Sequence, residues 1–210
     1  MLNFHLPYLA LNPADFWHRW HISLSTWLRD YLYVSLGGNR GGRARTYRNL
    51  FLTMLLGGLW HGAAWNFVAW GAFHGALLAV YRLGRGVFER VAPVTAVGVS
   101  LWRSLGRLLT FHLVCLGWVL FRAESLAHAG DLLQRLFGPW QLGLVPEWLL
   151  PFAVLTLPLV LMQAGQSLTG DLCFLGRWPT AARAAVYAGL VLGLVVLGED
   201  FGQPFIYFQF

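Results

Sequence analysis

The sequence predicts an all-α fold, a polytopic transmembrane helix bundle with an interfacial or re-entrant amphipathic helix. Hydrophobic residues make up 57% of the 210 residues and charged residues only 11%, whereas an ordinary soluble domain has about 25% charged residues. The net charge is +6, and the 15 basic residues are all arginines, which lie in short stretches between apolar runs. Arginine-rich loops beside apolar segments are typical of the cytoplasmic side of a membrane protein. We therefore expect membrane lipid around the chain and no nucleic acid.

The first predicted element is an amphipathic helix over residues 12–33. Asn12 can cap this helix, Pro13 suits its first position, and Asp15 lies in its first turn. Because the segment is too polar for an ordinary span, we expect it to lie at the membrane interface or to dip into the bundle. A glycine-rich basic loop follows at 36–43; no strand precedes it, so it is a weak candidate for phosphate binding.

Residues 49–81 are predicted to form a broken pair of helices that meet inside the membrane near His61. One helix of this length would be about 50 Å long, and the hydrocarbon core is about 30 Å thick. Arginines flank both ends and place both on the cytoplasmic side: Arg40, Arg43, Arg45, Arg48, Arg82, Arg85 and Arg90. Broken helices occur at membrane depth where they line a cavity. The glycines at 57, 58 and 62 fit such a break and fit close helix packing equally well.

Three further apolar segments are predicted to cross the membrane, near residues 105–121, 148–164 and 181–198. A spanning helix needs about 20 apolar residues, with a range of about 17–25, so each segment is close to the required length. Together with the pair at 49–81, they predict about five spans.

Two histidines are the strongest candidates for chemistry. An ionisable group inside a membrane segment is costly and marks a candidate functional site, and His61 stands at the expected helix break. A neutral imidazole there could take a proton from an acceptor hydroxyl. His21, on the amphipathic helix, could orient the substrate or a neighbouring group. For His61, a structural role as a hydrogen-bonded histidine of the bundle stays open. For His21, spacing alone favours a histidine that lies at the membrane interface. A structural role is also the favoured interpretation for His74 and His112.

The sequence predicts no metal site. His18 and His21 lie three residues apart on one helical face, and histidine is a common metal ligand. No Asp, Glu or Cys joins them at a recognisable spacing, and Cys115 and Cys173 stand alone. There is also no Gly-x-Ser-x-Gly motif of a serine hydrolase.

Several motifs resemble the membrane-bound O-acyltransferase family, and in particular its bacterial alginate O-acetyltransferase branch. They are the Trp- and His-rich segment at 15–33, Leu-Gly-Gly-Asn-Arg at 36–40, Tyr-Arg-Asn-Leu at 47–50, Gly-Gly-Leu-Trp-His-Gly within 57–65, Phe-Arg-Ala-Glu-Ser at 121–125 and the aromatic ending at 204–210. His18 and Ser35 depart from this pattern, because Arg and Pro are common at these positions in the family.

The resemblance implies acyl transfer at a tunnel through the bacterial inner membrane. The presumed catalytic histidine of the family falls on His61, and its second signature position falls on His21. The implied acyl donor is acetyl-CoA or another acyl thioester, with no bound cofactor. The implied acceptor is an exported polysaccharide such as alginate, reached directly or through a periplasmic acetyltransferase. Arg40, Arg43, Arg45 and Arg48 could attract coenzyme A, although membrane orientation is their favoured role.

Family members are about twice as long as this chain, which therefore resembles the C-terminal part of a membrane-bound O-acyltransferase domain over residues 1–210. We expect the isolated chain to be inactive or to need a missing N-terminal half. Two other functions stay open. One is a proton-coupled transporter in which His61 and His74 relay protons. The other is a non-catalytic membrane scaffold of a polysaccharide export complex.

Overall fold

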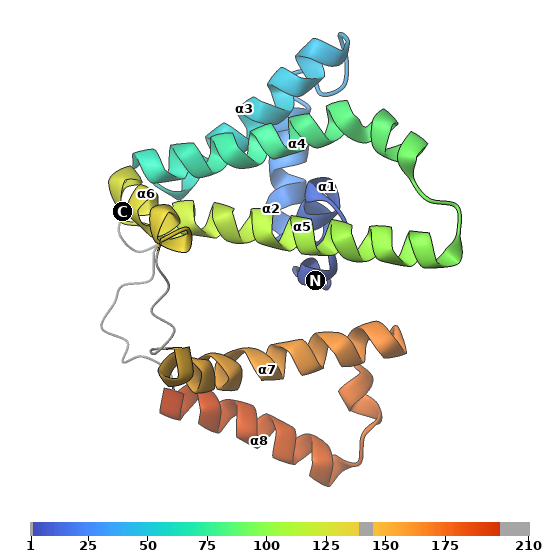
Figure 1. Ribbon diagram of the computed structural model, residues 1–210, viewed down its shortest axis with the longest axis vertical. Helices are drawn as coiled ribbons and strands as arrows, with labels where there is room; N and C mark the ends of the chain where they lie inside the picture. The colour runs from blue at the N-terminus through green and yellow to red at the C-terminus, as the bar shows by residue number, and fades with distance from the viewer. Residues whose placement is uncertain (1, 139–144, 198–210) are drawn as a thin grey trace. The chain divides into compact units, whose positions relative to one another are not determined.

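The structure, a computed structural model, describes residues 2–138 and 145–197. Every regular element within these two ranges is a helix, which confirms the predicted all-α fold class. The chain divides into two compact units, Met1–Pro139 and Trp140–Phe210 (Figure 1). The last residue of the predicted span 181–198 and the motif at 204–210 lie outside the described residues.

The first unit begins with four short helices: η1 (Pro7–Leu9), α1 (Pro13–Arg19), α2 (Ile22–Trp27) and the π-helix η2 (Leu28–Tyr33). As predicted, Asn12 caps the first α-helix, because its Oδ1 accepts a hydrogen bond of 2.8 Å from the backbone N–H of Asp15. The prediction of one continuous helix over 12–33 is wrong. The chain leaves the helical path at Trp20 and His21, and a separate helix follows.

Hydrogen bonds from the preceding segment hold this break. The N–H of His5 donates to the carbonyl of Arg19, and the N–H of Ile22 donates to the carbonyl of Asn3, both at 2.9 Å. The Asn3 Oδ1 also accepts from the N–H and the hydroxyl of Ser23, at 3.0 and 2.9 Å. These bonds satisfy backbone groups that an interrupted helix leaves unpaired. Because they join residues far apart in sequence, helix propensity does not predict the break.

A glycine-rich turn connects η2 to the next helix. Four glycines in it have positive φ, a region that glycine adopts with little strain: Gly37, Gly38, Gly41 and Gly42. The buried Asn49 anchors the turn, because its Nδ2 donates to the carbonyl of Gly38 at 3.0 Å. Arg48 in turn donates to the Asn49 Oδ1. The Tyr-Arg-Asn motif therefore ties the glycine-rich motif to the helix that follows.

Replacing Asn49 by alanine is expected to release this turn. The change removes a buried donor from the Gly38 carbonyl, which costs about 1–3 kcal/mol. The expected result is faster trypsin cleavage after Arg40 and Arg43 in the protein held in detergent, measured by mass spectrometry. Ser35→Ala, an exposed change in the same segment, is the control and should leave the cleavage rate unchanged. Equal cleavage rates in the two variants would contradict this anchoring role.

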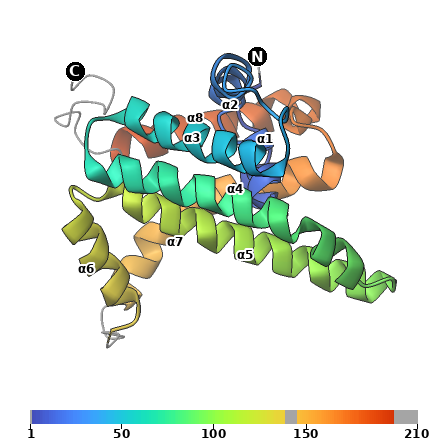
Figure 2. The ribbon, with the colours of Figure 1, turned by 90° about the horizontal axis from the view of Figure 1, so that it is seen from above.

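Helices α3 (Arg43–His61) and α4 (Trp65–Val91) form an antiparallel hairpin (Figures 1 and 2). Their backbones approach closely at glycines. A Cβ on Gly71 would lie 2.5 Å from the carbonyl oxygen of Met54. Close backbone approach at small residues is typical of helix pairs in membranes, so the glycines here serve packing between helices.

The two helices are longer than the predicted pair at 49–81. α3 starts at Arg43 and α4 continues to Val91. Arginine is a good helix former, so a helix can continue through arginine-rich sequence. The apolar residues indicate which part of a helix suits the bilayer and do not indicate where the helix begins or ends. The turn at 62–64 directly follows His61, where the sequence analysis expects the two helices to meet.

Helix α5 (Ala96–Arg122) packs against α4 and is followed by α6 (Leu126–Leu136). Figure 2 shows α4 lying between α3 and α5. The buried Asn66 joins α4 to the end of α5, since its Nδ2 donates to the carbonyl of Ala123 at 2.8 Å. The predicted span near 105–121 therefore lies within a longer helix.

The second unit contains α7 (Val145–Thr169), the short 3-10 helix η4 (Phe174–Arg177) and α8 (Thr180–Leu197). α7 contains Pro151 and Pro158, which membrane helices tolerate. These helices cover the predicted spans at 148–164 and 181–197.

Two described helical segments are long and apolar enough to cross a membrane: Ala96–Arg122 and Leu149–Thr169. The apolar part of α8, Thr180–Gly193, is shorter. α3 and α4 do not meet this criterion, because Trp, His, Asn and Gly dilute their apolar character and arginines occupy one end of each. These two segments agree with a membrane protein, and the five spans stay a prediction.

Candidate active site

His61 is the last residue of α3 and is 7% exposed. Its ring lies edge-on to aromatic rings from three helices, with centroid distances of 5.0 Å to Phe121, 5.1 Å to Trp60 and 5.4 Å to Trp70. Phe67 completes this aromatic cage at 6.3 Å. Such surroundings exclude most water, and electrostatic interactions of the imidazole are stronger in a medium of low dielectric constant.

His21 stands at the break between α1 and α2 and has a left-handed backbone conformation, with φ 45° and ψ 54°. This conformation costs a residue other than glycine about 1–2 kcal/mol. Strained residues of this kind cluster at active sites and ligand clamps. The Nδ1 of His21 is buried and has no hydrogen-bond partner among the described residues. The break therefore presents a fixed imidazole to the interior of the unit.

The fold places both predicted site residues in the first unit, within range of an electrostatic interaction, although 40 residues separate them in the sequence. His61 is the last residue of α3, and His21 directly precedes α2. Both residues therefore lie at interruptions in the helical path.

His74 packs next to this pair. It is 2% exposed, and its ring centroid lies 4.9 Å from that of Trp70 and 5.2 Å from that of Trp17. A Cβ on Gly117 would lie 2.5 Å from its Nε2, so the ring fits tightly against the backbone of α5. This environment agrees with the packing role that the sequence analysis favours for His74.

His18 and His112 are both exposed. The His112 Nδ1 lies 2.7 Å from the carbonyl of Leu108 within α5, which agrees with a structural role. Within the described ranges, no group of three or more His, Cys, Asp or Glu side chains is placed to hold a metal ion.

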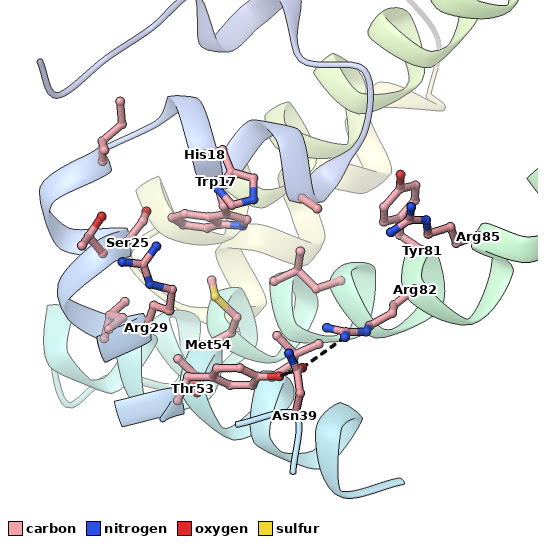
Figure 3. A pocket seen from close by; sticks show the side chains of 17 residues that line it. Trp17, His18, Ser25, Arg29, Asn39, Thr53, Met54, Tyr81, Arg82 and Arg85 are labelled. Carbon is pink, nitrogen blue, oxygen red and sulfur yellow. Dashed lines mark hydrogen bonds between the residues drawn. The ribbon is translucent and has the colours of Figure 1, made fainter. Parts of the chain in front are cut away.

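A cavity of about 550 Å³ lies beside the aromatic cage, between the N-terminal helices and the α3–α4 hairpin (Figure 3). Trp17 lines this cavity and packs on Trp70 of the cage, with ring centroids 5.8 Å apart. Met54 forms part of the opposite wall, on the same helix as His61. Neither His21 nor His61 lines the cavity.

Three arginines line the cavity, and they come from two elements. Arg29 of η2 lies on one side, and Arg82 and Arg85 of α4 lie on the other (Figure 3). Arg82 donates to the Oδ1 of Asn39 at 3.1 Å. Arg29 donates to Asp30 at 2.7 and 3.2 Å, and this hydrogen bond lowers the pKa of the carboxyl. Arginines therefore border the cavity on two sides.

The arginines that the sequence analysis considers for coenzyme A are not in this cavity. Arg40, Arg43, Arg45 and Arg48 lie outside its lining, and all four are exposed. Arg48 bonds to Asn49 within α3. The structure thus gives these residues no part in the cavity, and their favoured role, orientation in the membrane, stays a prediction.

Comparison with protein families gives one match in the N-terminal half of the chain. Residues 3–100 match the model of MBOAT, the membrane-bound O-acyltransferase family. This range includes α1, the glycine-rich turn, the α3–α4 hairpin and both histidines.

The chain belongs to the membrane-bound O-acyltransferase family.

Three curated relatives show how far this membership extends. The probable alginate O-acetylase AlgI of Pseudomonas aeruginosa is 54% identical over 146 residues, which is 68% of this chain and 26% of that protein. The peptidoglycan O-acetyltransferase of Helicobacter pylori is 45% identical over 137 residues, 65% of this chain and 25% of that protein. The teichoic acid D-alanyltransferase of Bacillus subtilis is 30% identical over 134 residues, 60% of this chain and 33% of that protein. The chain thus spans about a quarter to a third of these relatives.

In this O-acyltransferase family member, the segments that carry the resemblance meet at the site. Residues 15–33 supply His21 and one wall of the cavity, and 57–65 supply His61 and the helix turn. Residues 121–125 supply Phe121 of the cage and the Ala123 carbonyl that Asn66 binds.

Sequence reasoning missed several residues of the site. Asn3 holds the break at His21, and no local pattern points to it. Trp70 and Phe121 enclose His61. The high content of tryptophan and phenylalanine in the sequence was the only indication of such a cage, and it does not show which rings contact the histidine. Arg29, Arg82 and Arg85 were hidden among the other arginines because their shared cavity depends on the packing of η2 against the hairpin.

Proposed function

We propose that this protein is an integral membrane O-acyltransferase of the bacterial inner membrane, with several membrane spans. It transfers an acetyl group from an acyl thioester on the cytoplasmic side to an exported polysaccharide such as alginate. A periplasmic acetyltransferase that modifies the polysaccharide is the alternative acceptor. The observation that carries the proposal is the position of His21 and His61 at two interruptions of the helical path in the same unit, in a chain whose relatives include O-acetyltransferases and a D-alanyltransferase.

The reaction assigns one role to each histidine. His61, as a neutral imidazole, takes the proton of the acceptor hydroxyl as the oxygen attacks the thioester carbonyl. The carbon–sulfur bond then breaks, and the imidazolium returns the proton to the leaving thiolate, so the transfer is neutral overall. His21 positions the proton acceptor and polarises the reacting group. The aromatic cage around His61 favours this chemistry by excluding water that would hydrolyse the thioester.

The arginine distribution supports the direction of transfer. The antiparallel hairpin brings the arginines at the start of α3 and at the end of α4 to the same end of the unit. Arginine-rich ends face the cytoplasm, so a cytoplasmic donor enters from that end. His61 lies thirteen residues beyond Arg48 on α3, or about 20 Å, which is well inside a hydrocarbon core of about 30 Å.

His21→Gly is the variant that tests the role of the His21 imidazole apart from its backbone. Glycine adopts positive φ without strain, so the break is expected to remain and the unfolding temperature to stay close to that of the unmodified protein. We expect O-acetylation to fall about 10–100-fold, since removal of a positioning or proton-transfer group costs a factor of this order. The measurement is the acetyl content of exported polysaccharide in cells that express the protein from its own gene.

His21→Ala is the matched comparison. It also removes the imidazole but keeps a Cβ in the left-handed conformation, so it is expected to be less stable than the glycine variant by about 1 kcal/mol. Full O-acetylation in the glycine variant would show that His21 acts through its backbone alone, and the two-histidine mechanism would then fail.

A further inference from the structure

A second cavity in the first unit, with a volume of about 390 Å³, lies where α4 and α5 meet the residues before α1. This volume falls within the range of about 300–1,000 Å³ that is usual for ligand sites. Tyr81 and Arg85 line both this cavity and the one shown in Figure 3. The rest of the lining is mostly apolar, and its larger members are Leu11, Phe88, Trp102, Leu105, Leu109 and Leu113. The cavity therefore suits a ligand with a long apolar part.

Three segments of the chain enclose this cavity. The segment before α1 contacts α5 closely, because a Cβ on Gly106 would lie 2.8 Å from the carbonyl oxygen of Leu11. On the α4 side, Phe88 stacks on Tyr81 with ring centroids 6.2 Å apart and planes 18° apart. The cavity is thus a bounded site, which distinguishes it from the open apolar face of a single helix that any lipid can cover.

The position of the cavity along α5 corresponds to one leaflet of a bilayer. Arg103 and Arg122 lie near the two ends of this helix, and the nineteen residues between them correspond to about 28 Å, close to a hydrocarbon core of about 30 Å. Trp102 lines the cavity beside Arg103, and tryptophan is enriched at the level of the lipid headgroups. Leu113 lines it ten residues further along, about 15 Å deeper. The lining therefore extends from headgroup level to about the middle of the membrane.

The charged side chains of the cavity leave one arginine unopposed. Arg85 and Glu89 both line it and form an ion pair of 2.7 Å, so their charges offset each other. Arg103 has no ion pair or side-chain hydrogen bond with any residue that the structure describes. Its planar guanidinium matches the oxygens of a phosphate group.

The same end of the two helices is rich in arginine. The loop at 92–95 joins the end of α4 to the start of α5 (Figure 1), and the arginines on either side of it are Arg82, Arg85, Arg90, Arg103 and Arg107. Arginine-rich ends face the cytoplasm. The cytoplasmic leaflet contains anionic lipids, and basic pockets between membrane helices on this side bind their headgroups.

We propose that this cavity binds an anionic phospholipid of the cytoplasmic leaflet. The phosphate binds Arg103 beside Trp102, and one acyl chain lies between α4 and α5 along Phe88, Leu109 and Leu113. The lipid is a structural ligand of the first unit, because it fills the space between the ends of two helices. This inference is separate from the acyl-transfer reaction and does not rest on the roles of His21 and His61.

The test is lipid binding to the protein expressed from its own gene and purified in detergent, measured by native mass spectrometry. The probes are phosphatidylglycerol and phosphatidylcholine with the same acyl chains, one anionic and one zwitterionic. Arg103→Gln is expected to weaken phosphatidylglycerol binding about fivefold, the usual effect of one arginine at an anionic membrane surface. It should change phosphatidylcholine binding less than twofold.

Arg107→Gln is the matched control. Arg107 is an exposed arginine of α5, one turn beyond Arg103 and outside the cavity lining, so this variant makes the same change in total charge. It should alter the binding of either lipid less than twofold. Equal weakening of phosphatidylglycerol binding in the two variants would mean that binding follows net charge alone, and the site would be overturned.

A competition experiment separates a lipid site from a simple anion site. Glycerol phosphate carries the anionic group without acyl chains, and at the same concentration as the lipid it should displace less than a tenth of the bound phosphatidylglycerol, because the apolar lining contributes most of the buried surface. Displacement of half or more would show that only the phosphate is bound, and the lipid assignment would fail. Unchanged O-acetylation in Arg103→Gln would not affect the proposal, since the lipid takes no part in the reaction.

Discussion

Replacing His61 by glutamine is expected to lower O-acetylation of the exported polysaccharide by about 10²–10⁴-fold, the usual effect of removing a general base. Glutamine cannot accept and return a proton at neutral pH, yet it fills much of the space inside the aromatic cage of Trp60, Trp70 and Phe121. Alanine would leave a cavity among these rings and destabilise the fold. Its loss of activity would then combine the loss of stability with the loss of the general base. The measurement is the acetyl content of the polysaccharide, normalised to the amount of protein in the membrane.

His112→Gln is the matched control for this experiment. It makes the same chemical change at an exposed histidine of α5 and is expected to leave O-acetylation unchanged. The two rival functions predict other outcomes. If the protein is a scaffold, His61→Gln is silent while deletion of the gene is not. If it is a proton-coupled transporter, the unmodified protein carries a proton flux in liposomes and His61→Gln abolishes that flux.

The fold class and the break at His61 were predictable because they depend on local signals. Low charge and long apolar segments define a membrane helix bundle, and a polar group between glycines marks an interruption at residues 60–62. The break at His21 was not predictable in this way. It depends on hydrogen bonds from Asn3 and His5, which no helical pattern contains, and its left-handed conformation is unusual for any residue except glycine.

The sequence singles out the two candidate histidines but not the residues that surround them. His21 and His61 stand out because ionisable groups are rare in apolar sequence. Charge patterns give the side of the membrane, and here they correctly group the arginines at one end of the hairpin. Charge patterns do not say which face of a helix an arginine occupies. The sequence therefore could not distinguish Arg82, which lines the cavity, from Arg48, which does not. This difference depends on how η2 packs against the hairpin.

Replacing Gly71 by leucine is expected to abolish the folded first unit, because the α3–α4 hairpin has no room for a side chain at this position. Even a Cβ there would lie 2.5 Å from the Met54 carbonyl oxygen and 3.0 Å from the Cα of Leu55. Both are backbone atoms, so relief requires the two helices to separate. Overpacking with small additions costs about 1–3 kcal/mol, and we expect that loss for Gly71→Ala. For leucine the loss is expected to approach the whole stability of a domain, about 5–15 kcal/mol.

Gly86→Ala is the control on the same helix, since a Cβ at Gly86 meets no atom within 4 Å. Alanine is better than glycine in a helix by about 1 kcal/mol, so this variant should be neutral or slightly more stable. The measurement is thermal unfolding in detergent together with the yield of membrane-inserted protein. Equal behaviour of the two alanine variants would mean that the hairpin does not pack at Gly71. The same hairpin brings Trp70 against His61, so any separation of α3 from α4 also opens the aromatic cage, and O-acetylation is expected to fall in Gly71→Ala by more than the loss of protein alone.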